Sequence, residues 1–522
     1  MRIMRQKYQP MERIAKNNFF LKIKVSRTGI LTALIFLFFT SPSADTFAQT
    51  WFNNSWNYRK SHVISQAAGA GTNYQIPITV NYGSGTDATG NVFCNSHCQT
   101  DFADVRFTAS DGTTLLNYWR ESFTASTSAV FWVQVQGDLT ISAQTIYIYY
   151  GATGQATTSN GTNTFLFYSD WEDNTLQGWT INKSTGTGTG TVVSLDGSLQ
   201  LRLNAPSTAN RVQATKAYAA GPGIMIESKV KTGATAGDGV LIGFSDGTMQ
   251  SVNEDAPVNS YSFNLSRNNN TVDQLQKTVA SVGTQLASVN ATIAANTYYN
   301  IGLSWAGTTL RGYRNRVQVL SATDNTFSTR PNVFVSADLN DKYYDWVFVR
   351  KYASPEPANS VWGVEALAPV TFSPASGCQG IGGIVITGTN FTGATAVNFN
   401  GVAAVFTVNS ATQITATVPL SATTGIISVI TPGGTATSVS SFTVNALPVS
   451  SVTNQTNITC FSANDGTITV SASGGAGPYT FSVDNGVSFL APTGTNLRLF
   501  TGLVPNTAYR IKVKDNNGCI SK

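Results

Sequence analysis

The sequence predicts an all-β protein made of tandem β-sandwiches. Short runs rich in Thr, Val, Ile and Tyr alternate with Gly, Asn and Asp along the chain, which is the pattern of strands joined by tight turns. The 522 residues are enough for several domains. Hydrophobic residues make up 42% of the chain and aromatic residues 11%, which excludes a wholly disordered protein.

The first 48 residues have the pattern of an export signal. Three basic residues, Lys22, Lys24 and Arg27, precede an apolar run over residues 29–39. A small-x-small cleavage site ends at Ala48, so residues 1–48 are predicted to be a signal peptide. The alternative is a short membrane anchor, although the run is shorter than the roughly 18 residues that a spanning helix needs.

The net charge limits the classes of partner that the exported protein can bind. Removing residues 1–48 takes away eight basic and two acidic residues, which changes the formal net charge from +5 to −1. Phosphate recognition needs cations, so neither nucleic acid nor an anionic membrane is expected as a partner. A second long apolar segment does not occur. We therefore expect a secreted or cell-surface protein, on the exterior of the outer membrane, with no membrane span after signal removal.

Residues 51–154 form the first predicted domain. Within 129–136, Phe131, Val133 and Val135 alternate with polar or outward positions, as in a half-buried strand. Separate motifs occur at 56–60 (Trp-Asn-Tyr-Arg-Lys), 101–107 (Asp-Phe-Ala-Asp-Val-Arg-Phe) and 116–121 (Leu-Asn-Tyr-Trp-Arg-Glu). This set resembles a domain-of-unknown-function family common in secreted bacterial and archaeal proteins. That family has no established activity, so the resemblance implies a location and no reaction.

Residues 165–367 form the second predicted domain. An aromatic-acidic motif opens it at 167–173, and Tyr299, Ile301, Leu303 and Trp305 alternate strictly before a hairpin expected through Asn315. The motif Tyr-Asp-Trp-Val-Phe-Val-Arg at 344–350 closes it. This layout resembles concanavalin-like (laminin-G-like) jelly rolls, which implies a two-sheet sandwich and includes both glycan-binding domains and glycosidases.

Two smaller predicted domains follow. Residues 369–445 contain Ile-Val-Ile-Thr-Gly-Thr-Asn-Phe at 384–391 and Ala-Val-Asn-Phe-Asn-Gly at 396–401, and they resemble the immunoglobulin-like IPT/TIG domain. Intracellular relatives bind DNA, but residues 369–444 contain no charged residue and no histidine, so DNA binding is rejected. Residues 449–522 resemble the gliding-adhesin (SprB-type) repeat of Bacteroidetes surface proteins, through the motifs at 465–470, 477–481 and 509–515. Relatives usually continue into further repeats, so we expect this chain to be a fragment.

Five cysteines in an exported chain suggest disulfides. Cys94 and Cys98 lie in one Cys-Asn-Ser-His-Cys loop and are expected to pair, because a metal site at this loop would lack ligands. The gliding-adhesin resemblance places Cys460 and Cys519 at the two edges of the last domain, which implies a disulfide between them. Cys378 is then expected to be a buried free thiol.

The candidate chemistry is sparse. Retaining glycosidases of the jelly-roll type carry Glu-x-Asp-x-x-Glu, and none of the seven glutamates stands in that arrangement. Adjacent carboxylates such as Glu172 and Asp173 point to opposite faces of a strand, although carboxylates from separate strands could converge. With two histidines and no Gly-x-Ser-x-Gly motif, nucleophilic hydrolysis is not expected. We predict no catalytic residue.

Four residues of the first domain are candidates for ligand binding. Asp104 and Arg106 project to one face of a predicted strand, and Trp119 and Glu121 follow in the next motif. The simpler interpretation is a structural ion pair beside these two residues. No metal or cofactor is predicted, because the calcium ligands that Asp238 or Asp246 could provide have no defined spacing.

These observations favour a non-catalytic, adhesin-like surface protein of a Bacteroidetes-like bacterium. Its jelly roll would bind glycan or another extracellular ligand, and the last two domains would act as spacers. One alternative is an extracellular polysaccharide hydrolase that uses the jelly roll, and another is a purely structural stalk. The sequence is compatible with more than one class of extracellular ligand.

Overall fold

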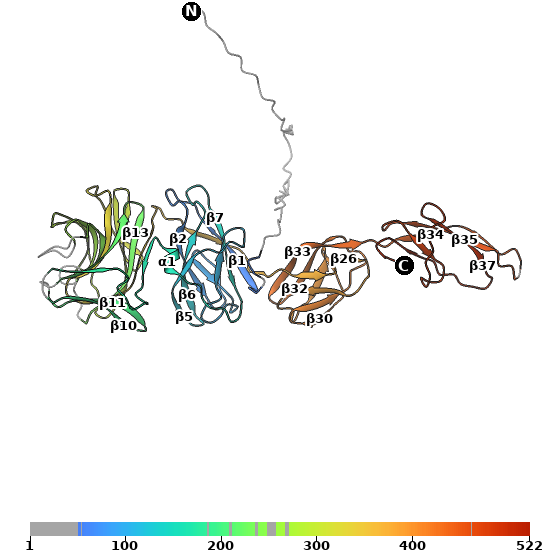
Figure 1. Cartoon of the computed structure of the whole chain (residues 1–522), viewed down its shortest axis with the longest axis horizontal. Coiled ribbons are helices and arrows are strands. Elements are labelled where there is room, and N and C mark those ends of the chain that lie inside the picture. Colours follow the sequence, from blue (N-terminus) through green and yellow to red (C-terminus); the bar gives the residue numbers. More distant parts are fainter. Residues whose placement is uncertain are drawn as a thin grey trace, which may run out of the picture. The chain divides into compact units, whose positions relative to one another are not determined.

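The computed structural model describes residues 51–53, 55–184, 187–207, 211–234, 239–247, 257–266, 271–460 and 462–522. The predicted signal peptide lies outside the described residues. Strands dominate the described chain, whose α-helix α1 (Gly161–Thr164) has only four residues (Figure 1). This confirms the predicted all-β class. None of the helices in the described part is long and apolar enough to cross a membrane.

Two sheets pack face to face in the first domain. Phe107, Phe131 and Ile148 are fully or almost fully buried between them. Trp132, which the alternation places outward, is buried as well, because this outer face packs against the second domain. The strands of the first sheet are β1 (Tyr58–Ile64), β7 (Gln144–Tyr150) and β4 (Arg106–Thr108), and those of the second are β3 (Asn91–Phe93), β2 (Tyr74–Asn81), β6 (Ser128–Val135) and β5 (Tyr118–Thr124).

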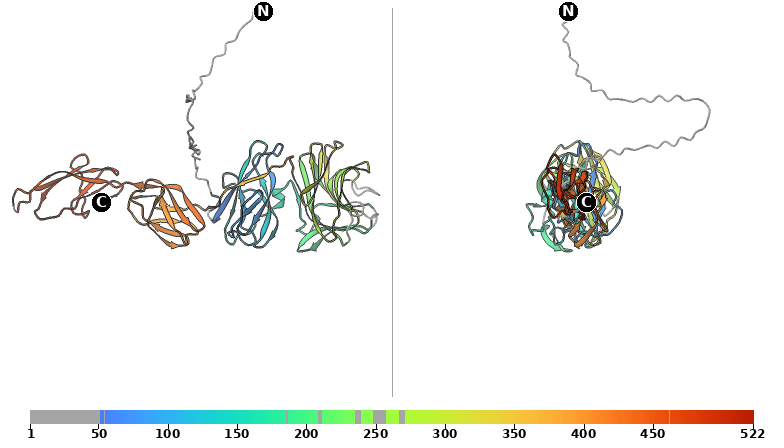
Figure 2. Two further views of the ribbon diagram at one scale, coloured as in Figure 1. Left: turned by 180° about the vertical axis from the view of Figure 1, so that it is seen from behind. Right: turned by 90° about the vertical axis from the view of Figure 1, so that its right-hand side faces the viewer.

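The first domain is completed by strands that come much later in the chain, after the whole second domain. β23 (Asn359–Trp362) and β24 (Ala366–Leu367) both pair antiparallel with β1, and Figure 2 shows this later segment, in orange, crossing the blue first domain. His62 lies opposite Trp362, and Tyr58 lies opposite Leu367. The expected second domain, 165–367, therefore ends too late, because residues 359–367 belong to the first sheet. The second domain is an insertion between two parts of the first.

The second domain is a β-sandwich of an eight-stranded and a seven-stranded sheet. Trp305, Tyr261, Phe263 and Tyr344 are fully buried between the sheets. In chain order the strands are β8 (Phe167–Ser169), β9 (Thr180–Lys183), β10 (Thr189–Leu195), β11 (Ser198–Ala205), β12 (Val212–Ala220), β13 (Ile224–Thr232), β14 (Val240–Ser245), β15 (Ser260–Ser266), β16 (Val272–Val279), β17 (Val282–Asn290), β18 (Tyr298–Ala306), β19 (Thr309–Arg314), β20 (Val317–Thr323), β21 (Arg330–Ala337) and β22 (Asn340–Lys351).

The predicted hairpin through Asn315 is present. β19 pairs antiparallel with β20, and Arg314 lies opposite Val317 across a two-residue turn. Both turn residues, Asn315 and Arg316, have positive φ angles of 50° and 63°, which is the backbone of a type I′ hairpin. The turn sets Arg316 at the end of the sheet that faces the first domain.

The third domain has two sheets around Ile386, Phe399 and Phe442, and the fourth has two small sheets around Val470 and Phe481. The IPT/TIG assignment of the third domain stays a prediction. The third-domain strands are β25 (Thr371–Ser373), β26 (Ser376–Cys378), β27 (Ile384–Thr387), β28 (Ala396–Phe399), β29 (Val402–Ala403), β30 (Phe406–Ser410), β31 (Gln413–Ala416), β32 (Gly425–Thr431) and β33 (Gly434–Asn445), and the fourth-domain strands are β34 (Val449–Thr456), β35 (Gly466–Ser473), β36 (Thr480–Ser482), β37 (Leu497–Leu503) and β38 (Lys512–Lys514).

The disulfides correct one prediction. Cys94 pairs with Cys98, as expected, with 5.9 Å between their Cα atoms. Cys519 pairs with Cys378, at a Cα separation of 5.5 Å, while Cys460 is exposed and free. The expected Cys460–Cys519 bond and the free Cys378 are therefore both wrong.

The reason is the position of Cys378 in its sheet. Cys378 lies opposite Asn445 at the end of β33, where the chain leaves the third domain for the fourth. The Cys519 sulfur lies 4.0 Å from the carbonyl oxygen of the same Asn445. The disulfide thus joins the third domain to the fourth, a pairing that spacing within the last domain does not indicate.

Candidate functional site

An aromatic cluster joins the first domain to the inserted jelly roll. Its buried members come from the outer faces of both domains and from the linker between them: Trp119, Trp132, Phe165, Trp346 and Phe348. Phe165 stacks on Phe348 at a ring distance of 4.0 Å, and Trp119 meets Trp346 edge to face at 5.6 Å. Such pairs add to the apolar burial itself. Two cavities each take one wall from this cluster.

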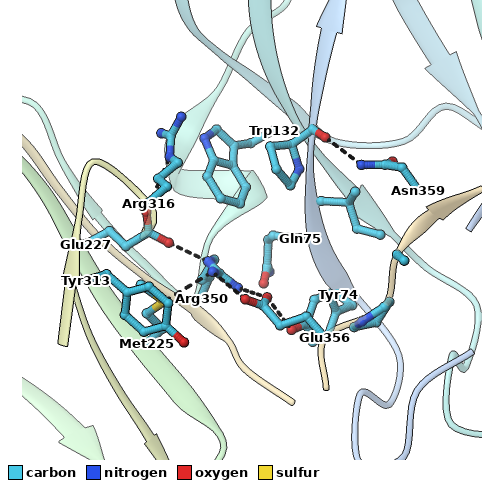
Figure 3. A pocket seen from close by; sticks show the side chains of 14 residues that line it. Tyr74, Gln75, Trp132, Met225, Glu227, Tyr313, Arg316, Arg350, Glu356 and Asn359 are labelled. Atoms are coloured by element: carbon cyan, nitrogen blue, oxygen red, sulfur yellow. Dashed lines mark hydrogen bonds and ion pairs between the residues drawn. The ribbon is translucent and has the colours of Figure 1, made fainter. Parts of the chain in front are cut away.

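The first cavity, here called the arginine cavity, has a volume of about 260 Å³. Its walls come from three parts of the protein: Tyr74 and Trp132 in the first domain, Arg316 and Arg350 in the jelly roll, and residues 356–359. The last belong to residues 352–367, which lead from the jelly roll back to the first sheet and are here called the returning segment. Figure 3 shows Arg350 between the carboxylates of Glu227 and Glu356.

Arg350 is the centre of the arginine cavity. Its Nε donates to Glu227 Oε1 at 2.6 Å, and its Nη2 donates to Glu356 Oε1 at 3.2 Å. The hydroxyl of Tyr74 donates to the other oxygen of Glu356 at 2.8 Å. Burial disfavours the charged guanidinium, but Glu356 and Glu227 outweigh it and raise the pKa of Arg350 well above its usual value. These bonds tie β22 to the first domain and to the returning segment.

Arg316 extends this network from the hairpin turn. Its guanidinium forms an ion pair with Glu121 of the first domain, and its Nε lies 3.6 Å from Glu227 Oε2. The indole nitrogen of Trp132 donates to the same oxygen of Glu121 at 2.8 Å. The guanidinium carbons of Arg316 and Arg350 lie 5.2 and 5.3 Å from the Trp132 ring centre, within cation–π range.

Three carboxylates converge on Arg316 and Arg350. Glu121 lies on β5, Glu227 on β13 and Glu356 between β22 and β23, so they come from separate parts of the chain, which is the arrangement that the sequence left open. Each of them pairs with a guanidinium. The network holds domains together.

The second cavity, here called the polar pocket, has a volume of about 550 Å³. Trp119 and Tyr168 form an aromatic part of its wall. The remaining wall is polar and comes from residues 159–162, Asp170, Gln177 and Lys216. The pocket therefore combines rings with several hydrogen-bonding groups.

Local contacts hold these side chains in place. Gln177 Nε2 donates to Asp170 Oδ1 at 3.2 Å, and the Asp170 backbone nitrogen donates to Gln177 Oε1 at 3.3 Å. Gly161 lies under the Tyr168 ring so closely that an added Cβ would be 2.4 Å from it. Burial, followed by the charge of Asp170, raises the pKa of Tyr168. The hydroxyl of Tyr168 therefore stays protonated, and it interacts with the carboxylate of Asp170.

Asp104 and Arg106 are held mainly by backbone groups. Asp104 is fully buried, and its carboxylate accepts from the backbone nitrogens of Gln99 and Gly151 at 2.8 and 2.7 Å. Arg106 donates to backbone carbonyls, including that of Ala156 at 2.7 Å. The two charges do not form the expected ion pair with each other, since backbone groups supply most of their hydrogen bonds. Of the other two candidates, Trp119 lines the polar pocket and Glu121 forms an ion pair with Arg316.

Sequence reasoning missed Arg350, Glu227, Tyr168 and Lys216 as cavity residues. A signal was present in the closing motif, where Trp346, Phe348 and Arg350 share one strand face while Val347 and Val349 face the core. An outward face with two large rings predicts that another surface covers it.

Both histidines contact the returning segment. His97 Nδ1 lies 3.1 Å from Glu365 Oε1, and His62 stacks on Trp362 and bonds Asn359 at 2.8 Å. Across the described ranges, no group of three His, Cys, Asp or Glu side chains could hold a metal ion. Of the two calcium candidates, Asp246 accepts from Asn259 at 2.7 Å, and Asp238 lies outside the described residues.

Two family models match parts of the chain. Residues 101–182 match a domain of unknown function (DUF2341), and residues 452–488 match the SprB repeat. No curated protein matches the chain in sequence.

Solved structures similar to the chain cover about a third of it. They include the carbohydrate-binding module CBM66 from Bacillus subtilis, with 16% identity over 33% of this chain and 96% of that one, at a TM-score of 0.27. A Bacillus licheniformis β-glucanase is 18% identical over 36% and 98%, at 0.27. A glycoside hydrolase family 16 endo-glucanase from Bacteroides ovatus is 14% identical over 35% and 99%, also at 0.27.

Proposed function

We propose that the protein is a non-catalytic, adhesin-like surface protein that binds a glycan in the polar pocket. The observation that carries this proposal is the composition of that pocket, in which Trp119 and Tyr168 lie beside Asp170 and Gln177. The match of residues 452–488 to the SprB repeat supports a place at the cell surface.

The pocket meets both requirements of sugar recognition. The C–H groups of a sugar ring are apolar and pack against aromatic side chains, while its hydroxyl groups need donors and acceptors of fixed direction. The reciprocal bonds between Asp170 and Gln177 hold both side chains before a ligand arrives. Such preorganisation reduces the entropy lost on binding.

The arrangement of the carboxylates supports binding without hydrolysis. The three that converge on Arg316 and Arg350 are paired with these arginines, and Asp170 accepts a hydrogen bond from an amide. In the polar pocket Asp170 is the single carboxylate among the described lining residues, whereas hydrolysis by either standard route uses two.

A glycan array followed by calorimetry on the full chain tests the proposal, with Gln177→Ala as the variant. Loss of the amide should weaken binding by about tenfold, because one polar hydrogen bond contributes a free energy of about this size to affinity. Gln318→Ala, at an exposed position on β20, is the matched control and should bind like the unchanged protein. Equal affinity of the two variants, or release of reducing sugar during the assay, would contradict the proposal.

A further inference from the structure

Lys216 is the cationic residue among those that line the polar pocket. It lies on β12 and is partly buried. Its Nζ is 3.5 Å from Ser169 Oγ and 5.0 Å from the centre of the Phe167 ring. An ammonium group has three donors, and within the described part of the chain no carboxylate forms an ion pair with this one.

Asp170, the carboxylate of the same pocket, is in the opposite situation. It accepts from the Gln177 amide at 3.2 Å and from the backbone nitrogen of Glu172 at 3.3 Å. Burial lowers the pKa of Lys216, and the charge of Asp173 offsets this only in part. The pocket therefore holds a partly buried cation, which contacts a neutral hydroxyl and a ring, beside an anion that already has donors.

We infer that the glycan bound in the polar pocket carries an anionic group, a carboxylate or a sulfate, and that Lys216 binds this group. The inference rests on the proposed glycan binding and names the class of sugar. An anion at Lys216 would supply the charge-assisted hydrogen bonds that Ser169 at 3.5 Å does not, and these are about twice as strong as neutral ones.

The other explanation for Lys216 is packing alone. Its methylene stem contacts the protein, since its Cε lies 3.9 Å from the position of a Cβ on Gly178, and its ammonium group is within cation–π range of Phe167. Lys216→Met keeps the stem and removes the charge, while Lys216→Arg keeps the charge. The two variants thus separate packing from anion binding.

The experiment measures the affinity of the full chain for three soluble polymers. Polygalacturonate carries carboxylates, dextran sulfate carries sulfates and dextran is neutral. We expect the unchanged protein to bind one of the two anionic polymers at least about tenfold more tightly than dextran. Lys216→Met should remove this preference and Lys216→Arg should retain it. Lys183→Met is the matched control, because Lys183 is exposed on β9, the strand that pairs with β12.

Each result has a defined meaning. Equal binding of dextran and both polyanions, or equal losses in Lys216→Met and Lys183→Met, overturns the anionic assignment and leaves glycan binding intact if Gln177→Ala still weakens it. A preference for a polyanion that depends on Lys216 but not on Gln177 supports the anion site and refutes the proposed pocket chemistry. No binding of any polymer overturns both. Thermal unfolding of each variant confirms that it is folded.

Discussion

Arg350→Met is expected to destabilise the contact between the jelly roll and the first domain. Glu227, its partner at 2.6 Å, is only 2% exposed. After the substitution this carboxylate would keep one cation, Arg316, at 3.6 Å. Removing one partner of a buried ion pair costs about 3–5 kcal/mol, because the other charge stays buried without compensation. Glu356 adds little to this cost, since its side chain is 34% exposed and water can take over.

Arg202→Met is the matched control. Arg202 also pairs with a carboxylate, that of Asp341 at 2.9 Å, but the two side chains are 36% and 24% exposed. An ion pair of this kind contributes about 0–1 kcal/mol. Both variants change an arginine to methionine on the same sheet, so the difference between them measures the effect of burial.

The measurement is urea unfolding followed by tryptophan fluorescence. Trp119, Trp132 and Trp346 all lie in the aromatic cluster between the two domains, so the signal reports on this contact. Transitions of the four domains are fitted separately, because a single two-state transition does not describe a multidomain chain. The double variant with Glu227→Gln should recover part of the loss, since the unpaired charge is then removed. Equal losses for Arg350→Met and Arg202→Met would refute the reasoning.

Two further predictions concern the disulfide and a histidine. Mass spectrometry without reduction should find a Cys378–Cys519 bond and a free Cys460. Cys378→Ser should lower the free energy of unfolding by about 4–5 kcal/mol, because the bond joins residues 141 positions apart. A disulfide-linked Cys460–Cys519 peptide pair would contradict this. Burial lowers the pKa of His62 below its usual 6.5. The unfolded chain therefore takes up a proton more readily than the folded one, so stability is present above pH 6.5 and falls as the pH drops below it. The melting temperature of His62→Gln should fall less between pH 7 and pH 5 than that of the unchanged protein, and equal slopes would show that His62 is not responsible.

Much of the local structure could be predicted from the sequence. The all-β class, the inward positions of Ile301, Leu303 and Trp305, and the hairpin at Asn315 all follow from patterns within about ten residues. These patterns are informative because side chains alternate across a strand with a period of two. Tight turns likewise demand residues that tolerate a positive φ.

The candidate site could be predicted only in part. Trp119 and Glu121 were recognisable as residues of interest, but Asp104 and Arg106 shared the same pattern and are bound mainly by backbone groups. Whether a polar side chain faces a cavity or a backbone group depends on the loop packed against it. That information is absent from the spacing of the residues themselves.

The pairing of distant segments was decided by the tertiary structure alone. The local pattern of residues 359–367 does not indicate which domain they belong to. They join the first sheet because β1 offers a free edge there. Cys519 bonds the cysteine that lies nearest to it in space, since a disulfide needs Cα atoms about 5.5 Å apart. Composition and periodicity therefore determine which elements form, while burial of their outer faces against one another determines which elements meet.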